Sequence, residues 1–254
     1  MSPIEATALA YRWRCGALQP VMHVQTVQLD HLLGIDRQKA ALVQNTAQFV
    51  AGRPANHALL TGARGTGKSS LVKALLTRFA TQGLRLVEVP AHELAALPEI
   101  VAPLRDRHER FLLYVDDFSV AANDPALVAL KTALDGGVEE PPENVLIVAT
   151  SNRRHLMPET KSDNGEYRWM DDELHPGEST EEKISLSERF GLWLSFHAFG
   201  QEQYLALVRS HLQRLGHAAW NNQLEVLALR WALNRASRSG RVAQQFARDY
   251  VGQL

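Results

Sequence analysis

Short apolar runs alternate with helix-length segments along most of the chain. Each run is bounded by Gly, Pro, Asp or Asn, and its hydrophobic positions are continuous rather than alternating. Strands that are buried on both faces have this pattern, which favours a mainly parallel sheet between helices over a β-sandwich. The pattern therefore predicts an α/β fold with a five-stranded sheet flanked by helices, whose strands are Ala58–Thr61, Leu84–Val89, Phe111–Val115, Val145–Ala149 and Leu192–Phe196.

The strand-like runs stop after Phe199. Apolar residues then recur three or four positions apart, in groups that begin near Tyr204, Val226 and Val242, as on the buried faces of helices. We therefore expect an N-terminal extension over residues 1–30, an α/β domain over 31–199, and a small all-helical domain over 200–254.

Residues 161–183 differ in composition from their surroundings, with eight acidic residues, three basic ones and few apolar ones. This composition predicts an insertion outside the core. It is either a solvated loop held open by its charges or a mobile element that contacts a partner through Trp169 and Met170.

Composition narrows the class of protein. The chain has 254 residues, 45% of them hydrophobic and 22% charged, which suffices for a substantial core. It has no apolar run of membrane-spanning length, and its first residues lack the apolar stretch of a signal peptide, so we expect a cytoplasmic protein without membrane contact. The single cysteine, Cys15, cannot form an internal disulfide. A net charge of -1 argues against a general electrostatic attraction to nucleic acid.

A phosphate-binding pattern lies between the first predicted strand and the helix after it. Residues 62–69 match G-x-x-x-x-G-K-[ST]. Glycines let backbone N–H groups converge on phosphate oxygens, and the helix N-terminus adds positive potential. Lys68 would reach the β- and γ-phosphates, and the Ser69 hydroxyl would bind Mg²⁺. The nucleotide-binding residues predicted in this loop are Gly62, Ala63, Arg64, Gly65, Thr66, Gly67, Lys68, Ser69 and Ser70.

Polar side chains follow two further predicted strands. Asp116 and Asp117 follow Phe111–Val115, and Asn152 comes shortly after Val145–Ala149. Strand ends carry the ligands of open α/β sheets. We expect Asp116 to hold Mg²⁺ together with Ser69, through water, and Asp117 to act as general base on an attacking water. The Asn152 amide can contact the γ-phosphate or orient that water. Without the phosphate-binding loop, polar strand ends with an Asx turn would be the simpler interpretation.

The order of these motifs resembles that of AAA+ ATPases, from about Leu29 to the end of the chain. The phosphate-binding loop is followed by the Asp-Asp strand, the asparagine, an arginine-containing segment at 182–191 and a helical lid with an arginine near its end. Residues 33–38, 150–156 and 182–191 are similar to a bacterial group of compact AAA+ proteins that are described as ATP-binding proteins of unknown function.

This resemblance implies roles for individual residues. Leu33, Gly34 and Ile35 would flank the adenine of ATP, Asp116 would be the Walker B aspartate, and Asn152 would be sensor 1. A P-loop sheet, ATP and Mg²⁺ as cofactors, and ATP hydrolysis are implied with them.

Two arginines have implied roles that constrain assembly. Arg241 would be the sensor 2 residue of the lid, and Arg189 would be an arginine finger donated to a neighbouring subunit. A finger of this kind completes the site only across a subunit boundary, so the resemblance implies a homo-oligomer. Many AAA+ proteins have Glu in the place of Asp117, and the shorter side chain suggests slow hydrolysis. The acidic insertion lies just before Arg189 and could reposition it.

Three functions agree with these features. The first is an oligomeric ATPase that remodels or loads a macromolecular partner, and the second is a slowly hydrolysing, nucleotide-gated binding switch. A small-molecule kinase fits the order of motifs less well.

The partner, protein or nucleic acid, is not specified by the sequence. Residues 90–94 offer no aromatic pore loop, which disfavours threading of a polypeptide. The basic segments 105–110, 153–155 and 235–241 are the candidates for DNA contact, although solvated helix faces explain them more simply. Residues 11–14, Tyr-Arg-Trp-Arg, could contact a partner, although burial of Trp13 is the simpler expectation.

Overall fold

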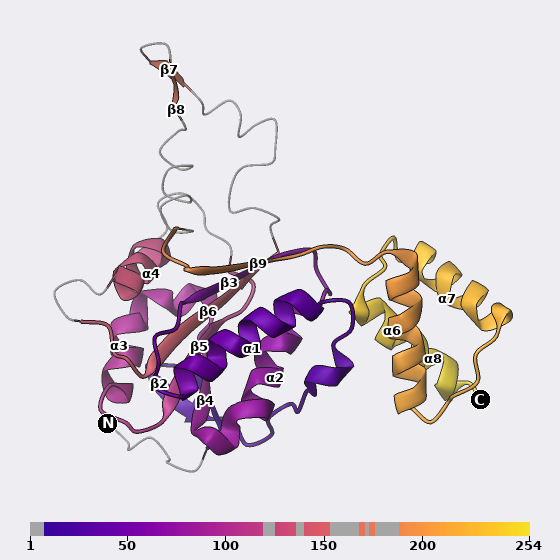
Figure 1. Cartoon of the computed structure of the whole chain (residues 1–254), viewed down its shortest axis with the longest axis horizontal. Coiled ribbons are helices and arrows are strands. Elements are labelled where there is room, and N and C mark those ends of the chain that lie inside the picture. Colours follow the sequence, from indigo (N-terminus) through magenta and orange to yellow (C-terminus); the bar gives the residue numbers. More distant parts are fainter. Residues whose placement is uncertain (1–7, 119–124, 136–139, 153–167, 171–172, 176–187) are drawn as a thin grey trace.

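The computed structural model describes residues 8–118, 125–135, 140–152, 168–170, 173–175 and 188–254. Helices and strands alternate from residue 36 to residue 151, and the described elements after residue 196 are all helices (Figure 1). The strands are β1 (Ala10–Arg14), β2 (Ala17–Pro20), β3 (Ala58–Gly62), β4 (Leu84–Glu88), β5 (Arg110–Val115), β6 (Val145–Ser151), β7 (Arg168–Met170), β8 (Glu173–His175) and β9 (Leu192–Phe196). The α-helices are α1 (Asp36–Val50), α2 (Lys68–Phe79), α3 (Leu97–Val101), α4 (Pro125–Asp135), α6 (Gln201–Arg214), α7 (Asn222–Asn234) and α8 (Gly240–Gly252). The 3₁₀ turns are η1 (Leu29–His31), η2 (Ala80–Gln82), η3 (Ala91–Ala96) and η4 (Ala102–Leu104).

The main sheet is parallel except at one edge. Its strand order is β2-β1-β4-β5-β6-β3-β9, and β2 alone in this sheet runs antiparallel to its neighbour. The predicted α/β class is confirmed, and the five predicted strands correspond to β3, β4, β5, β6 and β9. The number of strands is a correction, because the sheet has seven strands rather than five.

The two additional strands come from the segment expected to be an N-terminal extension. In β1, Tyr11 and Trp13 are buried while Arg12 and Arg14 are exposed, so polar and apolar positions alternate. Such a strand contains no continuous apolar run and is therefore not predicted by that pattern. β1 pairs with β4 in parallel, and its Arg12 guanidinium forms an ion pair with Glu88 at 2.6 Å. The expected burial of Trp13 is confirmed, with 4% of the residue exposed.

Helices cover both faces of the sheet and form two cores. Helices α1 and α2 bury Leu42, Phe49 and an apolar stripe of α2 against one face of the sheet. The segment from η3 to η4 and helix α4 cover the other face, with Leu97 and Leu130 among the fully buried residues. Both faces are therefore dry, which explains the continuous apolar runs of the central strands.

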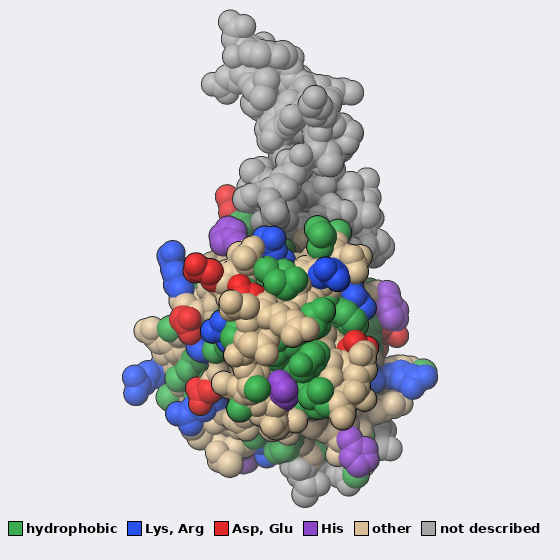
Figure 2. Space-filling model, turned by 90° about the vertical axis from the view of Figure 1, so that its right-hand side faces the viewer, with side chains coloured by type: hydrophobic (Ala, Val, Ile, Leu, Met, Phe, Trp, Pro, Cys, Tyr) green, Lys and Arg blue, Asp and Glu red, His purple; other side chains and the backbone are tan. Residues whose placement is uncertain are grey.

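The last three helices pack against one another at one end of the molecule (Figure 1). The Tyr204 hydroxyl donates a hydrogen bond to the Ala228 carbonyl at 3.1 Å and so ties α6 to α7. The core of these helices is continuous with the core on the α1–α2 side of the sheet. Viewed from this end, hydrophobic side chains lie among polar ones and charged residues lie mostly toward the rim (Figure 2).

Part of the predicted acidic insertion lies within the described residues. Strands β7 and β8 pair antiparallel in a small sheet of their own, which the composition does not predict. The rest of residues 161–183 lies outside the described part of the chain. None of the described helices is both long and apolar enough to span a membrane.

His57 predicts how the stability of the fold depends on pH. Its Nδ1 atom accepts a hydrogen bond from the Ile147 N–H at 3.1 Å, and burial lowers its pKa to about 4. The unfolded chain therefore binds more protons than the folded chain between pH 6.5 and about 4, so the free energy of unfolding falls as the pH falls through this window.

A His57→Asn variant should flatten this dependence, since an asparagine oxygen can accept the same hydrogen bond without titrating. Thermal unfolding between about pH 7 and pH 4 measures the effect. His92→Asn, at an exposed histidine, is the control and should keep the wild-type slope. An identical slope in His57→Asn and the wild-type protein would contradict this assignment.

Candidate functional site

The loop after β3 depends on glycines for several separate reasons. Gly62 has φ +125°, and a Cβ atom there would lie 1.9 Å from the Phe196 carbonyl oxygen. Only a glycine at this position lets strand β9 pack so closely. Gly65 and Gly67 have φ +71° and +99° and shape the turn itself. The loop therefore adopts the tight curl that the motif predicts, and α2 begins directly after Gly67.

Lys68 is the most enclosed charge of the loop, with 5% of the residue exposed. Its ammonium donates hydrogen bonds to the carbonyl oxygens of Gly62 and Ala63 at 2.7 and 2.8 Å, and to Asn152 Oδ1 at 3.2 Å. Burial lowers the pKa of Lys68, although Asp116 and Asp117 nearby favour the charged form. The cation is thus held over the loop by internal acceptors.

Asp116 sits at the centre of a cluster of donors. Its Oδ1 accepts hydrogen bonds from Ser69 Oγ at 2.9 Å, from Thr150 Oγ1 at 2.6 Å and from the Asp117 N–H at 3.1 Å. Burial by itself would raise the pKa of Asp116, but the surrounding donors, first among them Thr150, outweigh burial and lower it. Asp116 therefore stays a carboxylate next to the Ser69 hydroxyl, as the sequence predicts for a magnesium pair.

Asp117 and Asn152 face each other across β5 and β6. The Asn152 amide donates a short hydrogen bond to the Asp117 carboxylate. Asp117 has φ +52°, and its N–H also donates to Thr150 Oγ1 at 3.0 Å, which holds this uncommon conformation. The predicted base and the predicted sensor are in direct contact.

These side chains border one cavity of about 580 Å³, a size that suits a small-molecule ligand. Of the predicted residues, Gly34, Gly62, Ala63 and Arg189 do not line the cavity. Gly34 instead packs close to the Phe199 ring. The predicted residues that do line it are Leu33, Ile35, Arg64, Gly65, Thr66, Gly67, Lys68, Ser69, Ser70, Asp116, Asp117, Asn152 and Arg241.

Other lining residues were not found from the sequence. The segment before α1 contributes residues 25–27 and His31 to the lining. The last helices contribute His211 and Arg214 from α6 and Gln244 from α8. Burial, followed by the charge of Arg214, lowers the pKa of His211 to about 4. A neutral His211 can accept a hydrogen bond at Nδ1 from the Arg214 guanidinium, with which it makes a short contact. Helical spacing places Leu207, His211 and Arg214 on one face of α6. This face mixes apolar and polar residues, so a pattern of apolar residues alone does not reveal it.

Arg189 lies beside the buried Phe190 and is itself half-buried. It is not enclosed in the core, and it is outside the lining of the cavity in its own chain. Its predicted role as a finger for a neighbouring subunit stays a prediction.

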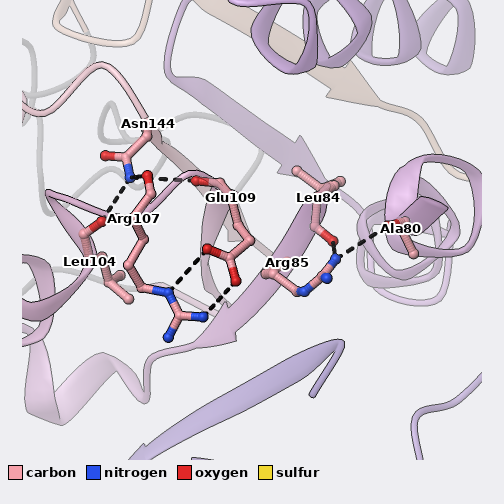
Figure 3. A network of polar contacts seen from close by, with 7 residues as sticks. All are labelled: Ala80, Leu84, Arg85, Leu104, Arg107, Glu109 and Asn144. Carbon is pink, nitrogen blue, oxygen red and sulfur yellow. Dashed lines mark hydrogen bonds and ion pairs between the residues drawn. The ribbon is translucent and has the colours of Figure 1, made fainter. Parts of the chain in front are cut away.

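The basic segment at residues 105–110 is largely engaged within the protein (Figure 3). Arg107 forms an ion pair with Glu109 at 2.5 Å, and the Asn144 amide donates hydrogen bonds to three backbone carbonyls of the same turn. Arg105 and Arg110 donate to the carbonyls of Glu140 and Glu143. Segment 153–155 lies outside the described residues. This geometry offers little support for DNA contact at 105–110.

Comparison with solved structures defines the class of fold. The chain is similar to the P216G mutant of RuvB from Thermotoga maritima, with TM-score 0.55, 15% identity, and coverage of 87% of this chain and 64% of that chain. It is also similar to the Orc1 protein of Aeropyrum pernix in complex with DNA, with TM-score 0.58, 15% identity, and coverage of 85% and 61%. The chain thus spans less than two thirds of the length of either structure. The fold is that of AAA+ P-loop proteins, as the resemblance of the motifs implies.

A family can also be assigned. Residues 6–254 match a family described as "Protein of unknown function (DUF815)", and the chain belongs to this family. A search of curated proteins found no match.

The contact between the loop and the lid can be tested at Gly65. The Gly65 carbonyl accepts a hydrogen bond from the Gly240 N–H at 2.8 Å, and a Cβ atom on Gly65 would lie 2.7 Å from Ser239 Cβ. Gly65→Ala should therefore push α8 away from the loop and increase the radius of gyration in small-angle X-ray scattering.

Gly83→Ala is the matched control. Gly83 also has positive φ, but nothing lies within 4 Å of the place that a Cβ atom would take there. Both variants should lower the unfolding temperature through backbone strain of about 1 kcal/mol, and only Gly65→Ala should change the scattering. Equal scattering curves for the two variants would show that this contact does not set the position of the lid.

Proposed function

We propose that this protein binds ATP with Mg²⁺ in the cavity and hydrolyses the nucleotide in a homo-oligomer, in order to remodel or load a macromolecular partner. The α/β domain over residues 31–199 and the lid over 200–254 would be its working parts. The observation that carries the proposal is the convergence of Lys68, the Ser69–Asp116 pair and the Asn152–Asp117 pair at one edge of the sheet.

The charges around the cavity support an anionic ligand. Its lining includes the basic residues Arg64, Lys68, Arg214 and Arg241 against the acidic residues Asp116 and Asp117. A polyphosphate would compensate this excess of positive charge, and its oxygens would replace the internal acceptors that now hold the Lys68 ammonium. Apolar lining residues such as Leu33 and Leu207 offer a surface for a base.

The residues fit a magnesium ion that is bound mainly by phosphate and water. The described residues contain no group of three or more His, Cys, Asp or Glu that could hold a metal without such help. Ser69 and Asp116, already in contact, supply one hydroxyl and one carboxylate, which is what Mg²⁺ requires in sites of this kind. Bound Mg²⁺ would neutralise charge on the phosphates, and Asp117 would accept the proton of an attacking water.

The first test of the proposal is ATP binding. Lys68→Ala removes the buried cation and should abolish the rise in unfolding temperature that ATP and MgCl₂ give the wild-type protein. Lys131→Ala, in α4 and away from the cavity, should keep the wild-type response. A Lys68→Ala variant that is stabilised by ATP as strongly as the wild-type protein would refute binding at this site.

The second test concerns the role of Arg189 across a subunit boundary. Arg189→Ala should lose activity by roughly 10³-fold or more, and Asp117→Asn should also be inactive. Mixing the two should restore about a quarter of the wild-type rate of phosphate release, since one variant supplies an intact site and the other an intact finger. No recovery on mixing, together with a specific activity that does not change with protein concentration, would exclude a finger acting between subunits.

A nucleotide-gated binding switch is the second candidate. The direct contact between Asn152 and Asp117 favours it, because a base held by an amide is less available to a water. The switch predicts ATP binding with turnover that Asp117→Asn leaves unchanged. A small-molecule kinase, in contrast, would release phosphate only to an added acceptor.

A further inference from the structure

One buried hydroxyl next to the candidate magnesium site makes no hydrogen bond. Tyr114, on β5, is 1% exposed, and its hydroxyl has no hydrogen-bond partner within the described part of the chain. An unpaired buried hydroxyl has lost its hydrogen bonds to water without replacing them, and such groups are rare in folded proteins. The tyrosine ring packs in an apolar core with Leu71 and Leu75 of α2, where a phenylalanine would fit equally well.

The position of this hydroxyl suggests what it serves. Tyr114 is two residues before Asp116, which directly follows the end of β5 at Val115, so the two side chains leave the chain on the same side. Ser69, Asp116 and Thr150 lie near enough to this hydroxyl to influence its pKa, although none of them meets the geometry of a hydrogen bond with it. The Tyr114 hydroxyl therefore lies next to the Ser69 hydroxyl and the Asp116 carboxylate, which would hold a magnesium ion.

The hydrogen bonds of Asp116 explain why a further donor is useful. All three donors to this side chain, Ser69, Thr150 and the Asp117 N–H, meet at the single atom Oδ1. The Ser69 hydroxyl can direct a lone pair to an ion and still donate its proton to Oδ1, so Oδ2 is the carboxylate oxygen that lacks a donor among the described residues. The Tyr114 hydroxyl can supply that donor and so fix the orientation in which the carboxylate meets the ion.

We propose that Tyr114 is a positioning residue, whose hydroxyl donates a hydrogen bond to Asp116 when a divalent cation engages Ser69 and Asp116. This inference rests on the proposed binding of a magnesium nucleotide and adds a residue to it. The hydroxyl is thus unpaired in the cation-free protein and paired in the loaded one. Its removal should weaken cation binding without weakening the fold.

The test is Tyr114→Phe, measured with the fluorescent nucleotide mant-ADP. In EDTA, the affinity for mant-ADP should match that of the wild-type protein. In a titration with MgCl₂, the concentration that gives half of the magnesium-dependent change should rise about ten- to hundredfold, the effect of one lost hydrogen bond to a charged group. Without nucleotide, the unfolding temperature should be equal to or above that of the wild-type protein.

Tyr204→Phe is the matched control, since the Tyr204 hydroxyl is equally buried but donates to the Ala228 carbonyl in the lid. It should lower the unfolding temperature and leave the magnesium titration unchanged. An unchanged magnesium titration in Tyr114→Phe would overturn the inference, as would a loss of stability like that of Tyr204→Phe without any effect of magnesium. A wild-type protein that binds no mant-ADP would instead refute the proposed function, and the role of Tyr114 with it.

Discussion

The site depends on the parallel pairing of three strands, β5, β6 and β3. Tyr114 lies opposite Val148, and Leu60 lies opposite Thr150, so the carboxyl ends of these strands reach the same edge of the sheet. Asp116 therefore meets the Thr150 hydroxyl directly. A slip of one residue between β5 and β6 would turn every side chain of the slipped strand to the other face and would separate these groups. The two dry cores on either side of the sheet prevent that slip.

The hydrogen-bond acceptors at this edge of the sheet explain why the charge of Lys68 can be buried. Lys68 is nearly enclosed, yet two carbonyl groups and an amide oxygen satisfy its three N–H donors. These acceptors are neutral, so they hold the ammonium without cancelling its charge. An anionic ligand that offers oxygens in the same place would gain a charged partner and would lose only neutral ones. In the proposed function, the ammonium would thus already be in position when an anion binds.

Particular residues show how far the sequence could predict this structure. The central strands were predictable because continuous apolar runs are local signals. The placement of Lys68, Asp116 and Asn152 at one edge of the sheet was predictable from a spaced motif and from the strand ends. Strand β1 was not, since its buried Trp13 alternates with exposed arginines and its partner β4 lies far along the chain. His211 and Arg214 were not found either, because they join the cavity only through the packing of the lid. Contacts that depend on tertiary arrangement leave little trace in a local pattern.

The helices after residue 200 contact the loop after β3 directly. The Gly240 N–H lies at the start of α8 and bonds to the Gly65 carbonyl, while Ser239 packs where a Gly65 side chain would be. Arg241 follows directly and lines the cavity. On the other side, the core of these helices is continuous with the core beneath α1 and α2. A ligand that displaced Gly65 would therefore also disturb the start of α8, because Ser239 and Gly240 contact this glycine directly.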